Sequence, residues 1–151
     1  MEVTGSHRIS ASRETVWRAL NDAEILKACI PGCEEIEQTS PTTLTAKVVQ
    51  KIGPVKARFE GAIELLNIDA PNSYTISGEG QGGVAGFAKG SADVTLAQEG
   101  EDTILSYQAQ GQVGGKLARL GSRLIDATAK KLAGKFFDNF QDALNNGPPE
   151  E

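Results

Sequence analysis

The sequence predicts an α+β fold in which a curved antiparallel sheet of about seven strands is crossed by one long C-terminal helix. An apolar stripe of helical period runs from residue 114 to about residue 144. A helix of about 30 residues is roughly 45 Å long, which spans a small domain. Between residues 33 and 113, six segments alternate apolar and polar side chains, separated by turn-forming residues. One strand and two short helices precede them, so the expected order is β-α-α-β6-α.

The individual elements follow from local patterns. Residues 3 to 10 alternate as a first strand does. Ser12 is the expected N-cap of a short helix that ends at Leu20, and a second helix is expected at residues 22 to 28. This second helix is expected to end before Pro31, because proline lacks the N–H that a helix interior needs. Successive strands joined by short turns pair antiparallel, and they are expected at residues 34–38, 43–49, 55–66, 74–80, 87–97 and 103–113.

Length and composition bound the class of protein. The 151 residues suit one domain, which we assign to residues 1–146, and we expect residues 147–151 to form a disordered tail. A net charge of -5 and a pI near 5.0 argue against a general nucleic-acid-binding protein. The first residues lack the features of a signal peptide, and no apolar run is long enough to span a bilayer. We therefore expect a cytoplasmic protein.

Residues for metal binding or catalysis are sparse. Cys29 and Cys33 are expected to be two reduced thiols, because a metal site needs further cysteine or histidine ligands and His7 is the only histidine. Residues 78 to 83 are rich in glycine but precede no helix, so they indicate a hairpin rather than a nucleotide site. Three strand carboxylates are expected to face solvent rather than a cavity: Glu60, Glu64 and Glu79. We predict no metal, no cofactor and no catalytic set.

Two features leave alternatives open. Small residues are frequent between residues 78 and 92, which predicts either a hollow beneath the helix or twisted strands without a ligand. Residues 116 to 135 carry six cations and one carboxylate, a local charge of +5 that leaves -10 for the rest of the chain. This basic face is either simply solvated or contacts an anionic membrane or an acidic protein. Phe87 beside Lys89 either packs on the core or adds to such a contact.

Several short motifs in the sequence resemble those of the G-subunit family of carbon monoxide dehydrogenase. This family belongs to the START-related helix-grip superfamily (SRPBCC), which includes the birch-pollen allergens, polyketide cyclases and lipid carriers. The two most specific words are Ile30-Pro31-Gly32-Cys33 and Val113-Gly114-Gly115-Lys116-Leu117-Ala118. The other matching words lie at residues 16–21, 53–61, 86–90 and 119–125 and at Phe136-Phe137, so the resemblance covers the chain to about Leu144.

The resemblance implies a helix-grip fold around an apolar cavity, without a metal or a catalytic set. Members of the family are accessory proteins of molybdenum hydroxylases of the carbon monoxide dehydrogenase type. They help the enzyme to associate with the cytoplasmic membrane and are thought to bind a quinone. The resemblance therefore implies a cytoplasmic protein that associates peripherally with the inner face of that membrane.

The first hypothesis is a non-enzymatic carrier or adapter that holds a quinone or lipid-like molecule. The candidate walls of its cavity are Phe59, Phe87, Leu124, Ile125, Thr128, Leu132 and Phe136. The candidate contacts to the membrane or a partner are Phe87, Lys89, Lys116, Arg119, Arg123 and Lys130. The alternatives are an aromatase or cyclase-like enzyme, which the lack of a cavity histidine weighs against, and a docking protein with a filled core.

Overall fold

The computed structural model describes residues 1–145, which form one seven-stranded sheet, two short helices and one long helix. The tail predicted at residues 147–151 lies outside the described residues. The helices are α1 (Arg13–Leu20), α2 (Ala23–Cys29) and α3 (Ser122–Asn145), with short 3-10 helices η1 (Gly83–Ala85) and η2 (Gly115–Leu120). The strands are β1 (Glu2–Ile9), β2 (Cys33–Ser40), β3 (Thr43–Ile52), β4 (Val55–Asp69), β5 (Ser73–Gln81), β6 (Phe87–Glu99) and β7 (Asp102–Gly114).

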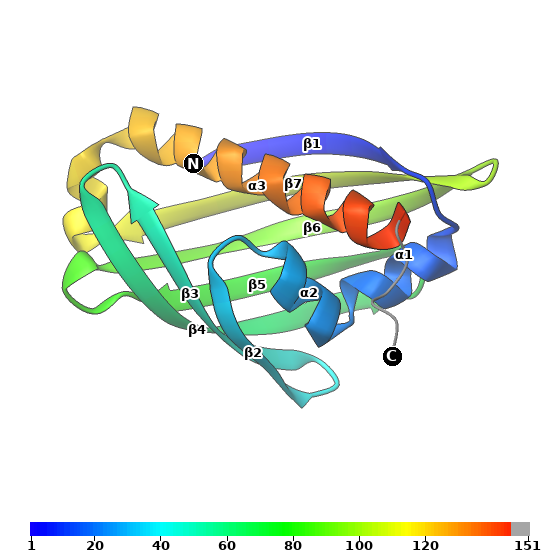
Figure 1. The fold of residues 1–151 in the computed structure, drawn as a ribbon, viewed down its shortest axis with the longest axis horizontal. Coiled ribbons are helices and arrows are strands. Elements are labelled where there is room, and N and C mark those ends of the chain that lie inside the picture. Colours follow the sequence, from blue (N-terminus) through cyan, green and yellow to red (C-terminus); the bar gives the residue numbers. More distant parts are fainter. Residues whose placement is uncertain (146–151) are drawn as a thin grey trace.

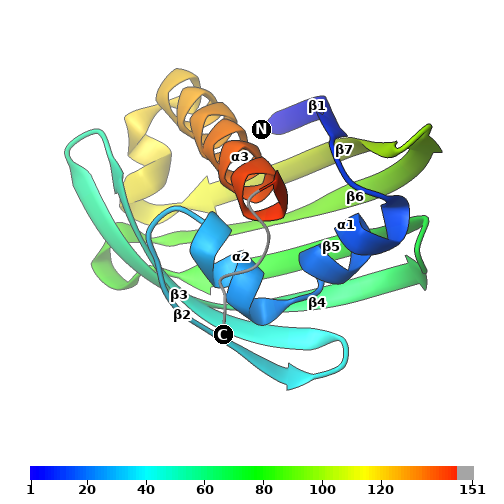
Figure 2. The same ribbon diagram turned by 45° about the vertical axis from the view of Figure 1, so that its right-hand side comes forward.

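The sheet confirms the predicted meander. All neighbouring strands pair antiparallel in the order β1-β7-β6-β5-β4-β3-β2, so β1 and β2 are its edges. Figure 1 and Figure 2 show α3 lying across the concave face of the curved sheet, with α1 and α2 covering the same face. One face of the sheet is thus covered by helices, and the other faces solvent.

The two short helices begin as their capping residues predict. The side chain of Ser12 accepts a hydrogen bond from the amide of Thr15, and Asp22 caps α2 through the amides of Glu24 and Ile25. These bonds satisfy amides that have no partner inside the helix. Because α1 and α2 end on buried apolar residues, they close the side of the molecule beside the last turns of α3.

The prediction of one uninterrupted helix from residue 114 is wrong in its bounds, because α3 begins only at Ser122. Gly115 and Gly121 have φ angles of +70° and +91°, which lie outside the right-handed helical region. A side chain at Gly115 would also lie 2.7 Å from the Cα of Gly86. Between these glycines, η2 turns so that Leu117 is fully buried. The helical spacing of the apolar residues between 115 and 120 therefore reflects the packing of η2, a turn separate from α3.

Two apolar clusters fill the space between the layers. The main core joins α1, α2 and the last turns of α3 to the sheet through Ile9, Val16, Ala19, Leu20, Cys29, Tyr74, Val94, Leu96, Leu105 and Phe140. The second core lies at the other end, where η1, η2 and the start of α3 meet the β3–β4 turn, and contains Ile52, Ala57, Ala85, Leu117 and Ile125. The space beneath the middle of α3 lies between these two clusters.

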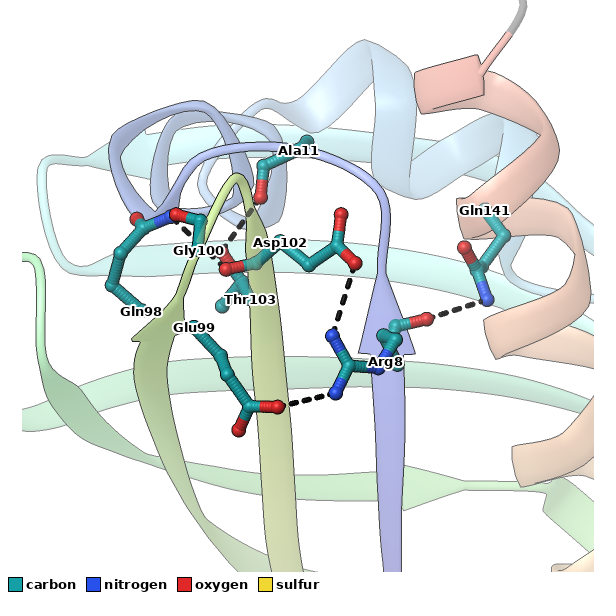
Figure 3. Close-up of polar contacts among 8 residues, drawn as sticks. All are labelled: Arg8, Ala11, Gln98, Glu99, Gly100, Asp102, Thr103 and Gln141. Carbon is teal, nitrogen blue, oxygen red and sulfur yellow. Dashed lines mark hydrogen bonds and ion pairs between the residues drawn. The ribbon is translucent and has the colours of Figure 1, made fainter.

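Polar contacts fasten the last turns of α3 to their neighbours. The side-chain amide of Gln141 donates to the carbonyl of Arg8 at 2.9 Å, and Asn139 donates to the carbonyl of Cys29 at 3.0 Å. The guanidinium of Arg8 pairs with Glu99 and Asp102, and Figure 3 shows this network tying β1 to the β6–β7 hairpin and to α3. These contacts anchor the C-terminal part of α3 to β1 and α2.

Candidate ligand-binding site

An apolar groove of about 450 Å³ lies between the concave face of the sheet and the middle of α3. From α3 it is lined by Ala129 and Ala133, and from the edge strand β1 by Met1 and Val3. The sheet contributes mainly small residues of β5, β6 and β7, with Ile76 and Tyr107 as the larger ones. Small residues on both layers leave room for a guest, because no side chain of residues 1–145 fills the space.

A row of three glycines forms part of the floor of this groove. In the register of the sheet, Gly78 of β5 pairs with Gly90 of β6, which pairs with Gly111 of β7. Ile76, Ala92 and Ala109 form the next row, so two successive rows present little or no side chain to the helix on β6 and β7. The small residues between residues 78 and 92 predicted a hollow as one of two alternatives. The register explains how they form one continuous hollow with those of β7.

Aromatic rings border the groove on the side of the main core. Tyr107 stacks with Phe137 at a centroid distance of 5.3 Å, and His7 stacks with Phe137 at 4.2 Å. Phe136 in turn packs edge to face with Phe137 at 5.0 Å. Burial raises the pKa of the Tyr107 phenol above its ordinary value of 10.0. This phenol is therefore protonated at neutral pH.

A second, polar hollow of about 810 Å³ lies on the outer face of the sheet. It is lined by outward-pointing side chains such as Glu64, Glu79 and Lys89, and an adjoining hollow includes Glu60. We assign the candidate ligand site to the inner groove, because an apolar guest needs apolar walls, and the lining of the outer hollow is about as polar as it is apolar. The three strand carboxylates thus lie on the outer face, as the alternation of β4 and β5 predicted.

In the described part of the chain, none of the seven residues predicted as cavity walls lines the inner groove. Phe59, Leu124 and Ile125 belong to the second core or pack against it, while Phe136 packs against the main core. Because side chains alternate along β6, Phe87 takes the outer face of the sheet with Lys89, and its ring lies against Gly114. Two further candidates are half-buried on α3: Thr128, whose hydroxyl donates to the carbonyl of Leu124 at 2.8 Å, and Leu132. Sequence reasoning did not select Ala109, Ala133 or Tyr107.

The residues predicted to contact a membrane or partner are distributed over three elements. Lys116 and Arg119 are exposed on η2, Arg123 and Lys130 are exposed on α3, and Lys89 lies on the outer face of the sheet. Within residues 1–145, ion pairs involve only Arg8, Lys47 and Arg58 among the cations. The cations of η2 and α3 have no carboxylate partner in that part of the chain.

Neither a metal site nor a membrane-spanning helix is found in the described part of the chain. No three side chains of histidine, cysteine, aspartate or glutamate are grouped there so that they would hold a metal ion. None of the helices from residue 1 to residue 145 is both long enough and apolar enough to cross a bilayer. Cys29 is buried and Cys33 half-buried, both as free thiols whose pKa is raised by desolvation.

A curved antiparallel sheet gripping a long helix, with a groove between them, is a START-like fold, and solved structures share it. A START superfamily protein from Mycobacterium smegmatis is 19% identical, with a TM-score of 0.65 over 96% of this chain and 94% of its own. A Thermus thermophilus protein is also 19% identical, with a TM-score of 0.72 over 94% of this chain and 95% of its own. At this level of identity the likeness establishes the fold alone.

The family follows from two closer matches. The family model of CoxG, described as the G subunit of carbon monoxide dehydrogenase, matches residues 5–145, so the chain belongs to this family. A conserved protein from Geobacillus kaustophilus is 31% identical, with a TM-score of 0.90 over 97% of this chain and 96% of its own. A search of curated proteins gave no match. The resemblance seen in the sequence is confirmed, and membership of the family together with the START-like fold supports a ligand-binding accessory role in general.

Proposed function

We propose that the protein is a non-enzymatic accessory protein that holds a quinone or similar lipid-like molecule in the groove beneath α3. The observation that carries this proposal is the hollow of about 450 Å³ between two layers of small residues. Its lining offers apolar contact and few polar groups, which suits a guest that is sparingly soluble in water. The family name supports a molybdenum hydroxylase of the carbon monoxide dehydrogenase type as the partner enzyme.

Filling the groove tests this proposal. Replacing both Ala129 and Ala133 by leucine places two larger side chains in the hollow, so the affinity for menadione, a small quinone, is expected to fall at least tenfold. Ala127 is exposed on the same helix, and Ala127→Leu is the matched control that leaves binding within twofold. Equilibrium dialysis measures the affinities. Equal binding by all three proteins, or none by the unmodified protein, would overturn the proposal.

We further propose that the end formed by η1, η2 and the start of α3 associates peripherally with the inner face of the cytoplasmic membrane. Val84 at η1 is 90% exposed, and η1 packs against η2, which carries Lys116 and Arg119. A protruding apolar side chain beside cations matches a bilayer that contains anionic lipids, where each cation contributes about 1 kcal/mol. Phe87 packs against Gly114, so in this proposal Val84 is the inserting residue.

Charge reversal tests the membrane contact. Lys116→Glu, Arg119→Glu and Arg123→Glu together are expected to lower binding to liposomes with anionic lipid more than tenfold at low salt. Lys27→Glu, which changes an exposed cation on α2, serves as the control. Cosedimentation of liposomes measures the effect. An electrostatic contact would be contradicted if the triple variant bound these liposomes as well as the unmodified protein does. It would also be contradicted if the unmodified protein bound zwitterionic liposomes equally well.

A further inference from the structure

Among residues 1–145, Tyr107 provides the one polar side chain on the inner face of the groove. Side chains alternate along a strand, so Tyr107, Ala109 and Gly111 of β7 point toward α3. The other polar residues of the lining point to the outer face and offer only backbone to the groove, namely Lys89, Ser91, Gln110 and Gln112. Of the side chains that the structure describes, a ligand in the groove therefore meets a single polar group, the phenol of Tyr107.

The Tyr107 hydroxyl is left without a protein partner. Its ring lies over Gly5 of β1, where a Cβ would be 2.8 Å from the hydroxyl oxygen, so glycine at this position makes room for the phenol. None of the hydrogen bonds formed by side chains within residues 1–145 involves this hydroxyl. Within residues 1–145 the one buried side-chain polar atom without a partner is Nε of Arg13, so the Tyr107 hydroxyl is within reach of water. A molecule bound in the groove can take the place of that water as its partner.

We propose that the hydroxyl of Tyr107 donates a hydrogen bond to a carbonyl oxygen on the ring of the ligand, and thereby selects carbonyl-bearing rings over plain hydrocarbons. This inference rests on the proposed function, since it names the chemical group by which the same groove recognises its guest. The glycine row and Ala109 on one side and Ala133 on the other form a slot that suits a flat ring. The stacked rings of Tyr107 and Phe137 border it with an aromatic surface.

The electrostatic state of the phenol agrees with a donor role. Because desolvation raises its pKa above 10.0, the group keeps its proton throughout the neutral range. A carbonyl oxygen accepts such a bond without changing charge, so the ligand remains neutral in its apolar surroundings. A ring without an acceptor would leave the hydroxyl unpaired and would gain only apolar contact.

The test compares two probes that differ only in the carbonyl groups. Menadione and 2-methylnaphthalene share the fused rings and the methyl group, and only menadione carries carbonyl oxygens. In Tyr107→Phe the affinity for menadione is expected to fall about 5- to 10-fold, the effect of one hydrogen bond, while that for 2-methylnaphthalene stays within twofold. The control is Tyr74→Phe, because Tyr74 belongs to the main core and does not line the groove.

The carbonyl stretching frequency of bound menadione gives a second readout. It is expected to lie lower in the unmodified protein and in Tyr74→Phe than in Tyr107→Phe, because a hydrogen bond weakens the C=O bond. If Tyr107→Phe leaves menadione binding and its carbonyl band unchanged, or weakens both probes equally, the role of Tyr107 is refuted while the groove remains a binding site. If neither probe binds the unmodified protein, the proposed function itself fails, and the role of Tyr107 with it.

Discussion

The middle and the last turns of α3 show how one helix serves two purposes. In the last turns, residues 135 to 145, Phe140 is fully buried and Asn139 and Gln141 bond to neighbouring elements. In the middle, residues 128 to 134, Ala129 and Ala133 face the groove. The last turns therefore fasten the helix, while the middle spans a hollow that the sheet does not fill. The difference lies in side-chain size, since the backbone is helical throughout.

The largest expected effect on the free energy of unfolding comes from a change in the last turns of α3. Phe140→Ala removes a fully buried aromatic ring from the main core, so the free energy of unfolding should fall by about 3–5 kcal/mol. Urea denaturation measures it. Asp142→Ala, an exposed change in the same turns, should stay within about 0.5 kcal/mol. A loss below about 1 kcal/mol for Phe140→Ala would mean that the last turns do not anchor the helix.

Alkaline pH should weaken the main core through Tyr74. Burial raises the pKa of Tyr74 far above its ordinary value of 10.0, so from about pH 10 the unfolded state loses a proton that the folded state retains. Stability is then full below this pH and falls above it, by up to about 1.4 kcal/mol per pH unit. Denaturation at several pH values should show this slope, and Tyr74→Phe should reduce it. If Tyr74→Phe leaves the fall of stability with pH unchanged, the phenol of Tyr74 is not its cause.

The polar contacts of the last turns are expected to contribute less. Asn139→Ala removes the hydrogen bond to the carbonyl of Cys29, a partly buried acceptor, and should cost about 1 kcal/mol. Gln141→Ala removes a more exposed bond to Arg8 and should cost less. Thermal unfolding of both variants gives the comparison. The reverse order would show that the network around Arg8, rather than the contact with α2, holds this part of the helix.

The smallest effect on stability is expected in the middle of α3. Ala133→Leu places its larger side chain in an empty groove, so the free energy of unfolding should change by less than about 1 kcal/mol. A filled core would instead lose about 1–3 kcal/mol through overpacking. Urea denaturation distinguishes the two cases. Strong destabilisation would contradict the contrast between the two parts of α3.

Local signals in the sequence predicted most of the fold. The capping side chains of Ser12 and Asp22 fix the starts of the short helices, and alternation fixes the strands of the meander. The start of the long helix was missed because Leu117 and Leu120 recur at a spacing that fits both an α-helix and a separate 3-10 turn. Gly115 and Gly121 mark the break only once their positive φ angles are known.

The candidate site was less accessible to sequence reasoning. Small residues between residues 78 and 92 predicted room, but the groove also needs Gly111 and Ala109, which lie beside them only through strand register. Alternation shows which face a side chain takes and not which residue stands opposite it. Tyr107 belongs to no motif of the sequence, and nothing in the chain alone indicates that Gly5 makes room for its ring.

The glycine row also determines how the capacity of the groove can be tuned. At Gly78 a methyl group would sit 3.6 Å from its nearest neighbour, the carbonyl oxygen of Ala62, an ordinary contact. At Gly90 and Gly111 it would come within 2.6 Å and 2.9 Å of backbone oxygens, which cannot move aside without distorting the sheet. A larger residue at position 78 can thus make the hollow shallower and restrict the size of its guest. Positions 90 and 111 must remain glycine, so the hollow keeps its depth there.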